Sequence, residues 1–254
     1  MGSLKGKIRR LGREITSPIK GVARRIAGPG DIAKYHHVKD GMATVHIDRF
    51  DGTPGFAPAY ARAVKAAGWD YGIPYRIHQT LWCAAQARKV PGDIVELGTG
   101  RGFMMSAALE AWPDWASSER SMYLFDTYEA GYIHPKGGGK RTEPSPYYAR
   151  SYEIEKANFA EWDRVHLIQG DVFETIPTQP ITQVAFLHID LNFYKPEIFG
   201  LHHFWPMIPV GGVVLLDDYA FRNHEQQYDA MNEAAKGLGV SILSTASGQG
   251  IIIK

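Results

Sequence analysis

The chain has almost no cysteine and no long apolar run, and each absence excludes a class of protein. Cys83 is the only cysteine among 254 residues. An internal disulfide bond and a zinc site built from several cysteines are therefore excluded, and we expect Cys83 to be a core residue. No run of about 18 apolar residues predicts a membrane-spanning helix. The N-terminus also lacks the pattern of a secretory signal, so the expected location is the cytoplasm.

A net charge of +1 leaves little charge of either sign in excess, but the first 30 residues differ from the rest. They carry eight basic side chains and one acidic side chain. Leu4, Ile8, Leu11 and Ile15 recur there at the helical period, which predicts a basic amphipathic arm over residues 1–30. Such an arm can contact an anionic membrane peripherally, pack on protein or stay disordered, and all three remain open. We expect no nucleic-acid partner.

The rest of the chain has an ordinary globular composition, with 44% hydrophobic and 22% charged residues. Residues 31–72 mix glycine, proline and aromatic residues without a clear period, so we interpret them as a cap or linker segment of unknown fold. Regular patterning begins at residue 73. We therefore assign residues 73–254 to one folded domain.

Short β-rich apolar runs alternate with helical stretches in this domain. Strands are predicted at residues 94–97, 122–125, 165–169, 184–189 and 213–216, and helices at 74–89, 103–109 and about 225–237. Such alternation is typical of a parallel sheet buried on both faces. Two further strands, 240–245 and 251–254, are joined by a tight turn and must be antiparallel. The expected fold is α/β and Rossmann-like, with the seven-stranded, mostly parallel sheet of class I methyltransferases ending in an antiparallel hairpin.

A glycine-rich loop follows the first of these strands. It reads Glu96-Leu-Gly98-Thr99-Gly100-Arg-Gly102 and opens the helix predicted at 103–109. Glycines let a backbone approach a ligand closely, and a helix N-terminus offers unpaired N–H groups. Dinucleotide-binding loops need a third glycine where this chain has Phe103. The loop therefore fits a cofactor without a pyrophosphate better.

Acidic residues follow three neighbouring strands. Glu96 precedes the glycines, Asp126 ends the second strand and is placed to accept ribose hydroxyl groups, and Asp171, followed by Val172, is placed to meet adenine. Ligands of open α/β sheets bind at the carboxyl ends of the strands. The alternative is that each acid only caps the next helix.

Over residues 90–254 the sequence resembles the macrocin-type O-methyltransferases. The resemblance rests on five motifs: Val90-Pro-Gly-Asp-Ile-Val-Glu96 with the glycine loop, Phe125-Asp-Thr-Tyr-Glu129, Gly170-Asp171, Leu187-His-Ile-Asp-Leu-Asn-Phe-Tyr194 and Gly211-Gly-Val-Val-Leu-Leu-Asp-Asp-Tyr219. It implies an S-adenosylmethionine donor, a magnesium-type divalent cation and a hydroxyl acceptor, as in sugar methylation during macrolide biosynthesis. The family usually has a second Asp two residues after the fourth-strand Asp, whereas this chain has Asn192. Because an amide cannot act as a general base, the identity of the base is left open.

We expect the cation to be held by Asp190, Asp217 and Asp218, whose hard oxygen donors suit magnesium or calcium far better than zinc. Adjacent Asp217 and Asp218 can share an ion only if the chain turns at the strand end. For proton removal the candidates are His224 and His188, because histidine titrates near neutrality. Residues 131–148 are either a lid over the acceptor or a mobile surface loop without that role, and both remain open.

The sequence therefore predicts a metal-dependent transfer of a methyl group from S-adenosylmethionine to a hydroxyl of a small molecule or glycan sugar, in natural-product or polysaccharide biosynthesis. An N-methyltransferase and a non-catalytic S-adenosylmethionine-binding protein are the alternatives. An NAD-dependent oxidoreductase is disfavoured by Phe103 and the terminal hairpin. Self-association into a homo-oligomer is also expected from the resemblance.

Overall fold

The computed structural model describes residues 37–44, 46, 50–128 and 152–254. The predictions for the arm at 1–30 and the lid at 131–148 lie outside these residues. The chain divides into two compact units, Met1–Arg49 and Phe50–Lys254. This boundary differs from the predicted one at residue 73, because residues 50–72 belong to the second unit.

A small hairpin is the described part of the first unit. Strand β1 (His37–Lys39) pairs antiparallel with β2 (Met42–Thr44). Asp40 and Gly41 form the turn, and both have positive φ angles, 53° and 73°. Two central residues with positive φ match the twist of a tight hairpin, and Asp-Gly is one of the sequences that adopt this turn most readily. The Asp40-Gly41 pair was thus a usable hairpin signal within residues 31–72, for which no fold was predicted.

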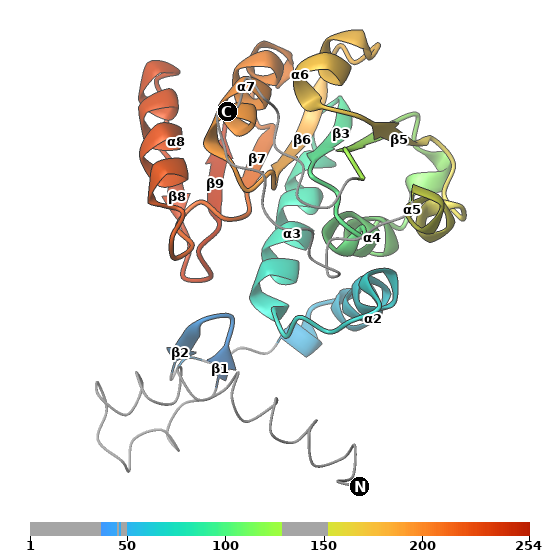
Figure 1. The fold of residues 1–254 in the computed structure, drawn as a ribbon. Helices are drawn as coiled ribbons and strands as arrows, with labels where there is room; N and C mark the ends of the chain where they lie inside the picture. Colours follow the sequence, from blue (N-terminus) through green and yellow to red (C-terminus); the bar gives the residue numbers. More distant parts are fainter. Residues whose placement is uncertain (1–36, 45, 47–49, 129–151) are drawn as a thin grey trace, which may run out of the picture. The chain divides into compact units, whose positions relative to one another are not determined.

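The second unit is built on a seven-stranded sheet with the strand order β5-β4-β3-β6-β7-β9-β8 (Figure 1). Strands β3 to β7 pair in parallel, and β9 pairs antiparallel with both β7 and β8. This confirms the predicted fold class and the terminal hairpin. The strands are β3 (Asp93–Leu97), β4 (Met122–Asp126), β5 (Val165–Gln169), β6 (Val184–Ile189), β7 (Val213–Leu216), β8 (Leu243–Ser244) and β9 (Gly250–Ile253). Strand β8 is thus shorter than the predicted 240–245.

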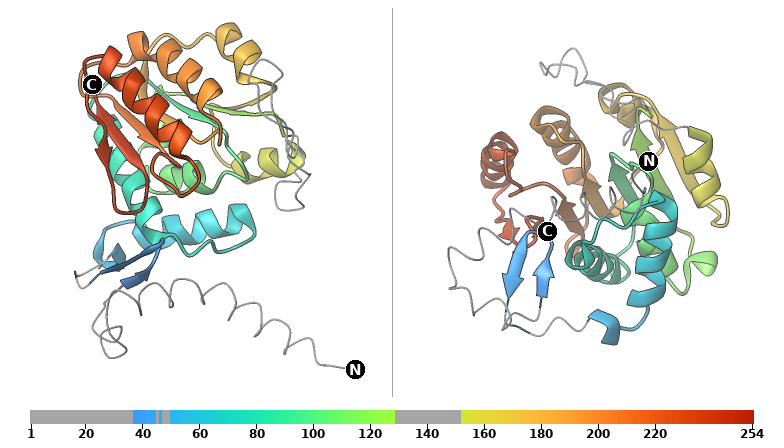
Figure 2. Two further views of the ribbon diagram at one scale, coloured as in Figure 1. Left: turned by 60° about the vertical axis from the view of Figure 1, so that its left-hand side comes forward. Right: turned by 60° about the horizontal axis from the view of Figure 1, so that its bottom comes forward.

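Helices cover both faces of this sheet (Figures 1 and 2). They are α2 (Phe56–Ala67), α3 (Pro74–Ala87), α4 (Phe103–Glu110), α5 (Tyr152–Phe159), α6 (Val172–Thr175), α7 (Tyr194–Phe204) and α8 (Glu225–Gly237), with short 3₁₀ turns η2 (Phe50–Gly52), η3 (Trp115–Ser117), η5 (Ile176–Thr178) and η6 (Trp205–Met207). One apolar core lies between the sheet and α2, α3 and α4, and a second lies between the sheet and α6, α7 and α8. Cys83 is fully buried in the first core, as expected. Among the described helices, none has the length and apolar character needed to cross a bilayer.

Helix α2 is the largest element that the sequence analysis did not predict. It begins after Gly55 and ends before Gly68, both in the left-handed region. Ala59, Ala63 and Ala66 recur at spacings of four and three residues and are buried, and the helix packs mainly on α4. The helical period was therefore present, but small alanines give a weak hydrophobic signal beside the surrounding glycine, proline and aromatic residues.

Candidate functional site

The glycine loop leaves β3 at the carboxyl edge of the sheet. Gly98 has a φ of 89°, and a Cβ atom there would lie 1.9 Å from the carbonyl oxygen of Asp190 at the end of β6. Only glycine fits so close to another backbone. The loop that is predicted to bind the cofactor therefore abuts the strand end that is predicted to bind the metal.

Asp126 ties this loop to the end of β4. Its Oδ2 accepts a hydrogen bond from the backbone N–H of Gly100 at 3.0 Å, and its Oδ1 accepts one from the N–H of Tyr128 at 2.9 Å. Both bonds fix the carboxylate at the sheet edge, where it remains partly exposed. The structure thus places Asp126 beside the glycine loop, as its predicted role requires.

Three buried polar atoms around the loop have no hydrogen-bond partner among the described residues. They are Glu96 Oε2, Thr99 Oγ1 and the Tyr128 hydroxyl. Burial and the negative charges of Asp126 and Glu155 raise the pKa of Tyr128, so its hydroxyl remains a proton donor. Because buried polar groups are normally paired, these atoms fit a site that a polar cofactor completes. Tyr128 was not predicted, although it follows Asp126 within a motif that was.

Asp171 performs the helix-capping role that the sequence left as an alternative. Its Oδ1 accepts a hydrogen bond from the N–H of Phe173 at 2.8 Å, at the N-terminus of α6. Val172 is buried as the first residue of that helix. Capping uses one carboxylate oxygen, and the contact with adenine stays a prediction.

The three predicted metal ligands converge. Each of Asp190, Asp217 and Asp218 offers an oxygen within 4.8 Å of the others. Backbone hydrogen bonds explain the alignment, since Asp190 N–H donates to Leu97 and Asp217 N–H donates to Ile189 across successive strand ends. Strand β7 ends at Leu216, and the chain bends at Asp217 and Asp218 as the shared site requires. Three carboxylate oxygens are a donor set that suits a hard divalent cation.

Arg76, in the first turn of α3, contacts this acidic cluster and was not predicted. Its Nη1 donates to Asp217 Oδ2 and, at 3.2 Å, to Asp218 Oδ1. Helix α3 packs on β6 and β7, which brings the side chain over the strand ends. A usable signal was present, because Arg76 lies one turn before Thr80 and two turns before Ala84 on the buried face of the predicted helix.

Charge is unevenly distributed within the cluster. Burial and the charges of Asp217 and Asp218 raise the pKa of Asp190 well above its ordinary value. Burial acts in the same direction on Asp217, but the positive charges of Arg76 and His188 outweigh it and hold the pKa of Asp217 below its ordinary value. The charges of His188 and Arg76 act on Asp190 in the opposite direction but do not outweigh its burial and its acidic neighbours.

His188 is buried between two acids, which argues against its predicted role in proton removal. Its Nδ1 lies 2.9 Å from Glu96 Oε1, its Nε2 lies 3.9 Å from Asp217 Oδ1, and none of its side chain is exposed. Burial opposes its protonation, but the two carboxylates raise the pKa of His188 to about 10. This enclosure keeps the ring away from solvent, and a part for His188 in proton removal stays a prediction. Gln249 of the terminal hairpin also contacts Asp217, because its Nε2 donates a hydrogen bond to Asp217 Oδ1 at 2.7 Å.

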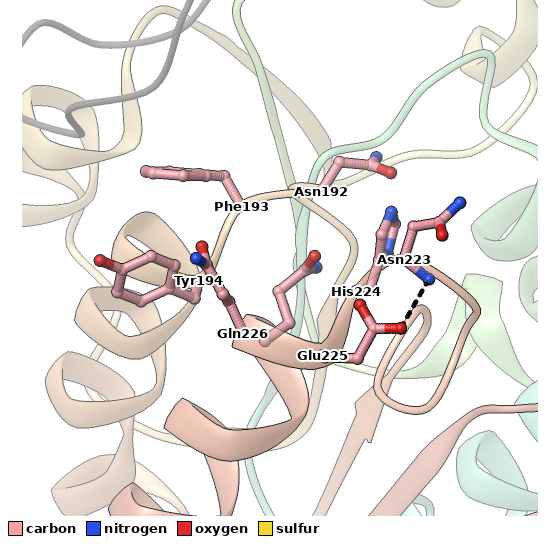
Figure 3. A pocket seen from close by; sticks show the side chains of 8 residues that line it. Asn192, Phe193, Tyr194, Asn223, His224, Glu225 and Gln226 are labelled. Carbon is pink, nitrogen blue, oxygen red and sulfur yellow. Dashed lines mark hydrogen bonds between the residues drawn. The ribbon is translucent and has the colours of Figure 1, made fainter.

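A pocket of about 360 Å³ lies between the first turns of α7 and α8 (Figure 3). Its lining consists of Asn192, Phe193, Tyr194, Asn223, His224, Glu225, Gln226 and Gln227. Asn192, Asn223 and His224 gather on one side of it, while Phe193 and Tyr194 point to the other. His224 Nδ1 lies 3.6 Å from Asp218 Oδ2, so the pocket adjoins the acidic cluster.

A buried carboxyl supports the wall of this pocket. Glu197 on α7 accepts a hydrogen bond from Gln227 Nε2 on α8 at 2.9 Å. Burial raises the pKa of Glu197 from its ordinary 4.5 to about 8. Burial thus favours the neutral form, although the hydrogen bond from Gln227 acts in the opposite direction.

Glu197→Gln is therefore expected to stabilise the protein increasingly as the pH rises. Because the folded-state pKa is raised, the wild-type carboxyl contributes its full stability below pH 4.5 and loses it as the pH rises toward 8. Glutamine cannot ionise, so its advantage should grow by on the order of 3 kcal/mol between pH 5 and pH 9. Urea unfolding at a series of pH values measures this. Glu233→Gln, at a site 79% exposed on α8, is the control, and an equal pH trend in both variants would contradict the assignment.

Comparison with protein families identifies the family to which the chain belongs. The model of the family described as Macrocin-O-methyltransferase (TylF) matches residues 76–242. A tetracenomycin-C-type rhamnosyl 4'-O-methyltransferase from Streptomyces olivaceus is 28% identical over 179 residues, which are 64% of this chain and 65% of that protein. Demethyldecarbamoylnovobiocin O-methyltransferase from Streptomyces niveus is 29% identical over 144 residues, covering 51% and 53%. The chain thus spans less than two thirds of the length of either relative.

Solved structures agree in fold. The O-methyltransferase NovP superposes with a TM-score of 0.60 at 23% identity, covering 76% of this chain and 88% of that one. Calicheamicin methyltransferase CalS11 gives a TM-score of 0.55 at 18% identity, covering 89% and 98%. At these identities the likeness establishes the fold alone.

Proposed function

Because the chain belongs to the macrocin O-methyltransferase family, we propose that it transfers a methyl group from S-adenosylmethionine to a hydroxyl group of a sugar-bearing small molecule or glycan. The observation that carries the proposal is the convergence of two features at one sheet edge. The glycine loop abuts Asp190 of the three-carboxylate cluster, and beside the loop lie buried polar atoms that have no hydrogen-bond partner in the described part of the chain.

In the proposed cofactor site, Gly98, Gly100 and Gly102 let the loop approach the ligand, and Asp126 accepts hydrogen bonds from the ribose hydroxyl groups. Glu96 and Thr99 offer buried polar atoms that lack partners among the described residues. Asp171 and Val172 flank the adenine at the end of β5. S-adenosylmethionine supplies the activated methyl group when bound.

In the proposed metal site, Asp190, Asp217 and Asp218 hold a magnesium-type cation. When bound, such a cation would supply Lewis acidity at the acceptor oxygen. Two observations support this site. The three carboxylates form a donor set that suits such a cation. Burial and the negative charges of its neighbours raise the pKa of Asp190, and a bound cation would relieve this repulsion between carboxylates.

We assign proton removal to His224. It opens α8 beside the pocket, and Asp218 lies 3.6 Å from its Nδ1, which favours one ring orientation. Asn192, on the same side of the pocket, contributes an amide but no base. The neighbouring amides of Asn223 and Gln226 pair well with hydroxyl groups, because each offers both a donor and an acceptor.

Two matched variants separate cofactor binding from chemistry. Asp126→Ala is expected to weaken S-adenosylmethionine binding by about tenfold or more, because hydrogen bonds to a charged acceptor contribute about 1.5 kcal/mol or more. His224→Gln should leave that affinity unchanged and lower kcat by about 10²-fold. Calorimetric titration with the cofactor and turnover assays measure the two effects. Unchanged cofactor affinity in folded Asp126→Ala protein would remove the cofactor assignment.

A further inference from the structure

The acidic cluster already holds a positive charge of its own. The Arg76 guanidinium is 9% exposed and bridges Asp217 and Asp218, and Asp190 also acts on it electrostatically. Exposed Phe221 packs its ring 5.4 Å from Arg76 Cζ. Arginine therefore occupies part of the carboxylate surface that a divalent cation would use.

We propose that Arg76 is a positioning residue that stands in for the divalent cation at Asp217 and Asp218 and competes with that cation for them. The proposal rests on the proposed metal site. It assigns two consequences to one side chain: Arg76 keeps the metal-free cluster assembled, and it weakens cation binding.

The first consequence follows from burial. Three carboxylates that lie this close together repel one another, and the charged Nη1 of Arg76 donates hydrogen bonds to two of them. Helix α3 fixes the base of the side chain, and Thr80 Oγ1 donates to the Arg76 carbonyl at 2.9 Å. The cluster therefore keeps its geometry before a cation arrives.

The weaker cation binding follows from the permanent positive charge of the Arg76 guanidinium. Arginine stays protonated in proteins, so it cannot relieve its repulsion with an incoming cation by losing a proton. The cation must share Asp217 and Asp218 with the guanidinium or displace it. The Phe221 ring offers the guanidinium a second favourable contact during such a displacement.

Titration of the full chain with Mn²⁺ tests the competition. Arg76→Gln is expected to bind Mn²⁺ roughly tenfold tighter or more than the wild type, because a fixed positive charge beside the site is removed. In excess chelator the same variant should unfold at a lower temperature than the wild type, and added Mn²⁺ should close the gap. Arg88→Gln is the control, because Arg88 pairs with Asp114 and contacts none of the cluster. Equal or weaker Mn²⁺ binding by Arg76→Gln would overturn the proposal.

A second test follows the Arg76 side chain of the wild-type protein by NMR. The side-chain Nε–H signal of Arg76, assigned with Arg76→Lys, should shift in the wild type on addition of Mg²⁺ and saturate with cation binding. An unmoved signal at saturating Mg²⁺ would overturn the competition. If the Gln variant binds Mn²⁺ and the wild type does not, the inference stands and the proposed metal dependence fails. Titration with S-adenosylmethionine and turnover assays test the proposed methyl transfer independently of these metal-binding measurements.

Discussion

Asp190→Asn is expected to lower turnover by about 10³-fold while leaving the metal-free protein as stable as the wild type. A Lewis acid contributes several kcal/mol to a transition state, and each 1.36 kcal/mol is a factor of ten in rate. Stability should survive because the ionised form of Asp190 is already disfavoured by burial and by its acidic neighbours. Turnover assays in magnesium and in chelator, with thermal unfolding in chelator, measure both effects.

Asp217→Asn is the informative comparison, because it should also cost stability. It leaves the buried cations Arg76 and His188 without their shared carboxylate, and breaking a buried ion pair typically costs about 3 kcal/mol or more. Full turnover of Asp190→Asn in excess chelator would contradict the metal mechanism and favour catalysis by alignment alone.

Gly98→Ala is expected to have a large effect on folding. The added methyl group would lie 1.9 Å from the Asp190 carbonyl oxygen, and the residue would keep a positive φ of 89°. Steric strain and the left-handed backbone together should cost about 3 kcal/mol of unfolding free energy. Denaturant unfolding measures this loss.

Gly237→Ala is the matched control for that substitution. Gly237 is the last residue of α8, and a Cβ atom there would meet nothing within 4 Å. Alanine should therefore stabilise the protein by about 0.5–1 kcal/mol. Similar losses in both variants would show that Gly98 is not constrained by the end of β6.

The parts of the site that lie directly after strands could be predicted from the sequence. Parallel strands end at the same edge of a sheet, so Asp126, Asp190 and Asp217 were expected there once the strands were recognised. Backbone hydrogen bonds between successive strand ends account for the observed alignment of Asp190 and Asp217.

The parts contributed by other elements could not be placed in the same way. Arg76 reaches the cluster from a helix 141 residues before Asp217, and Gln249 reaches it from the terminal hairpin. Their contacts depend on how a helix packs on the sheet, which a local pattern does not specify. His188 shows the same limit, because its strand position was predicted, while its enclosure by Glu96 and Asp217 depends on three strands together.

Methyl transfer to a sugar oxygen can be followed directly with a ¹³C-labelled methyl group on S-adenosylmethionine. The full chain would be incubated with Mg²⁺ and a panel of deoxysugar glycosides that carry free hydroxyl groups, and the products examined by NMR and mass spectrometry. The account predicts a labelled methyl group on a sugar oxygen, with formation lost in chelator and in Asp190→Asn. A labelled methyl group on nitrogen, or product formed equally well in chelator, would contradict it.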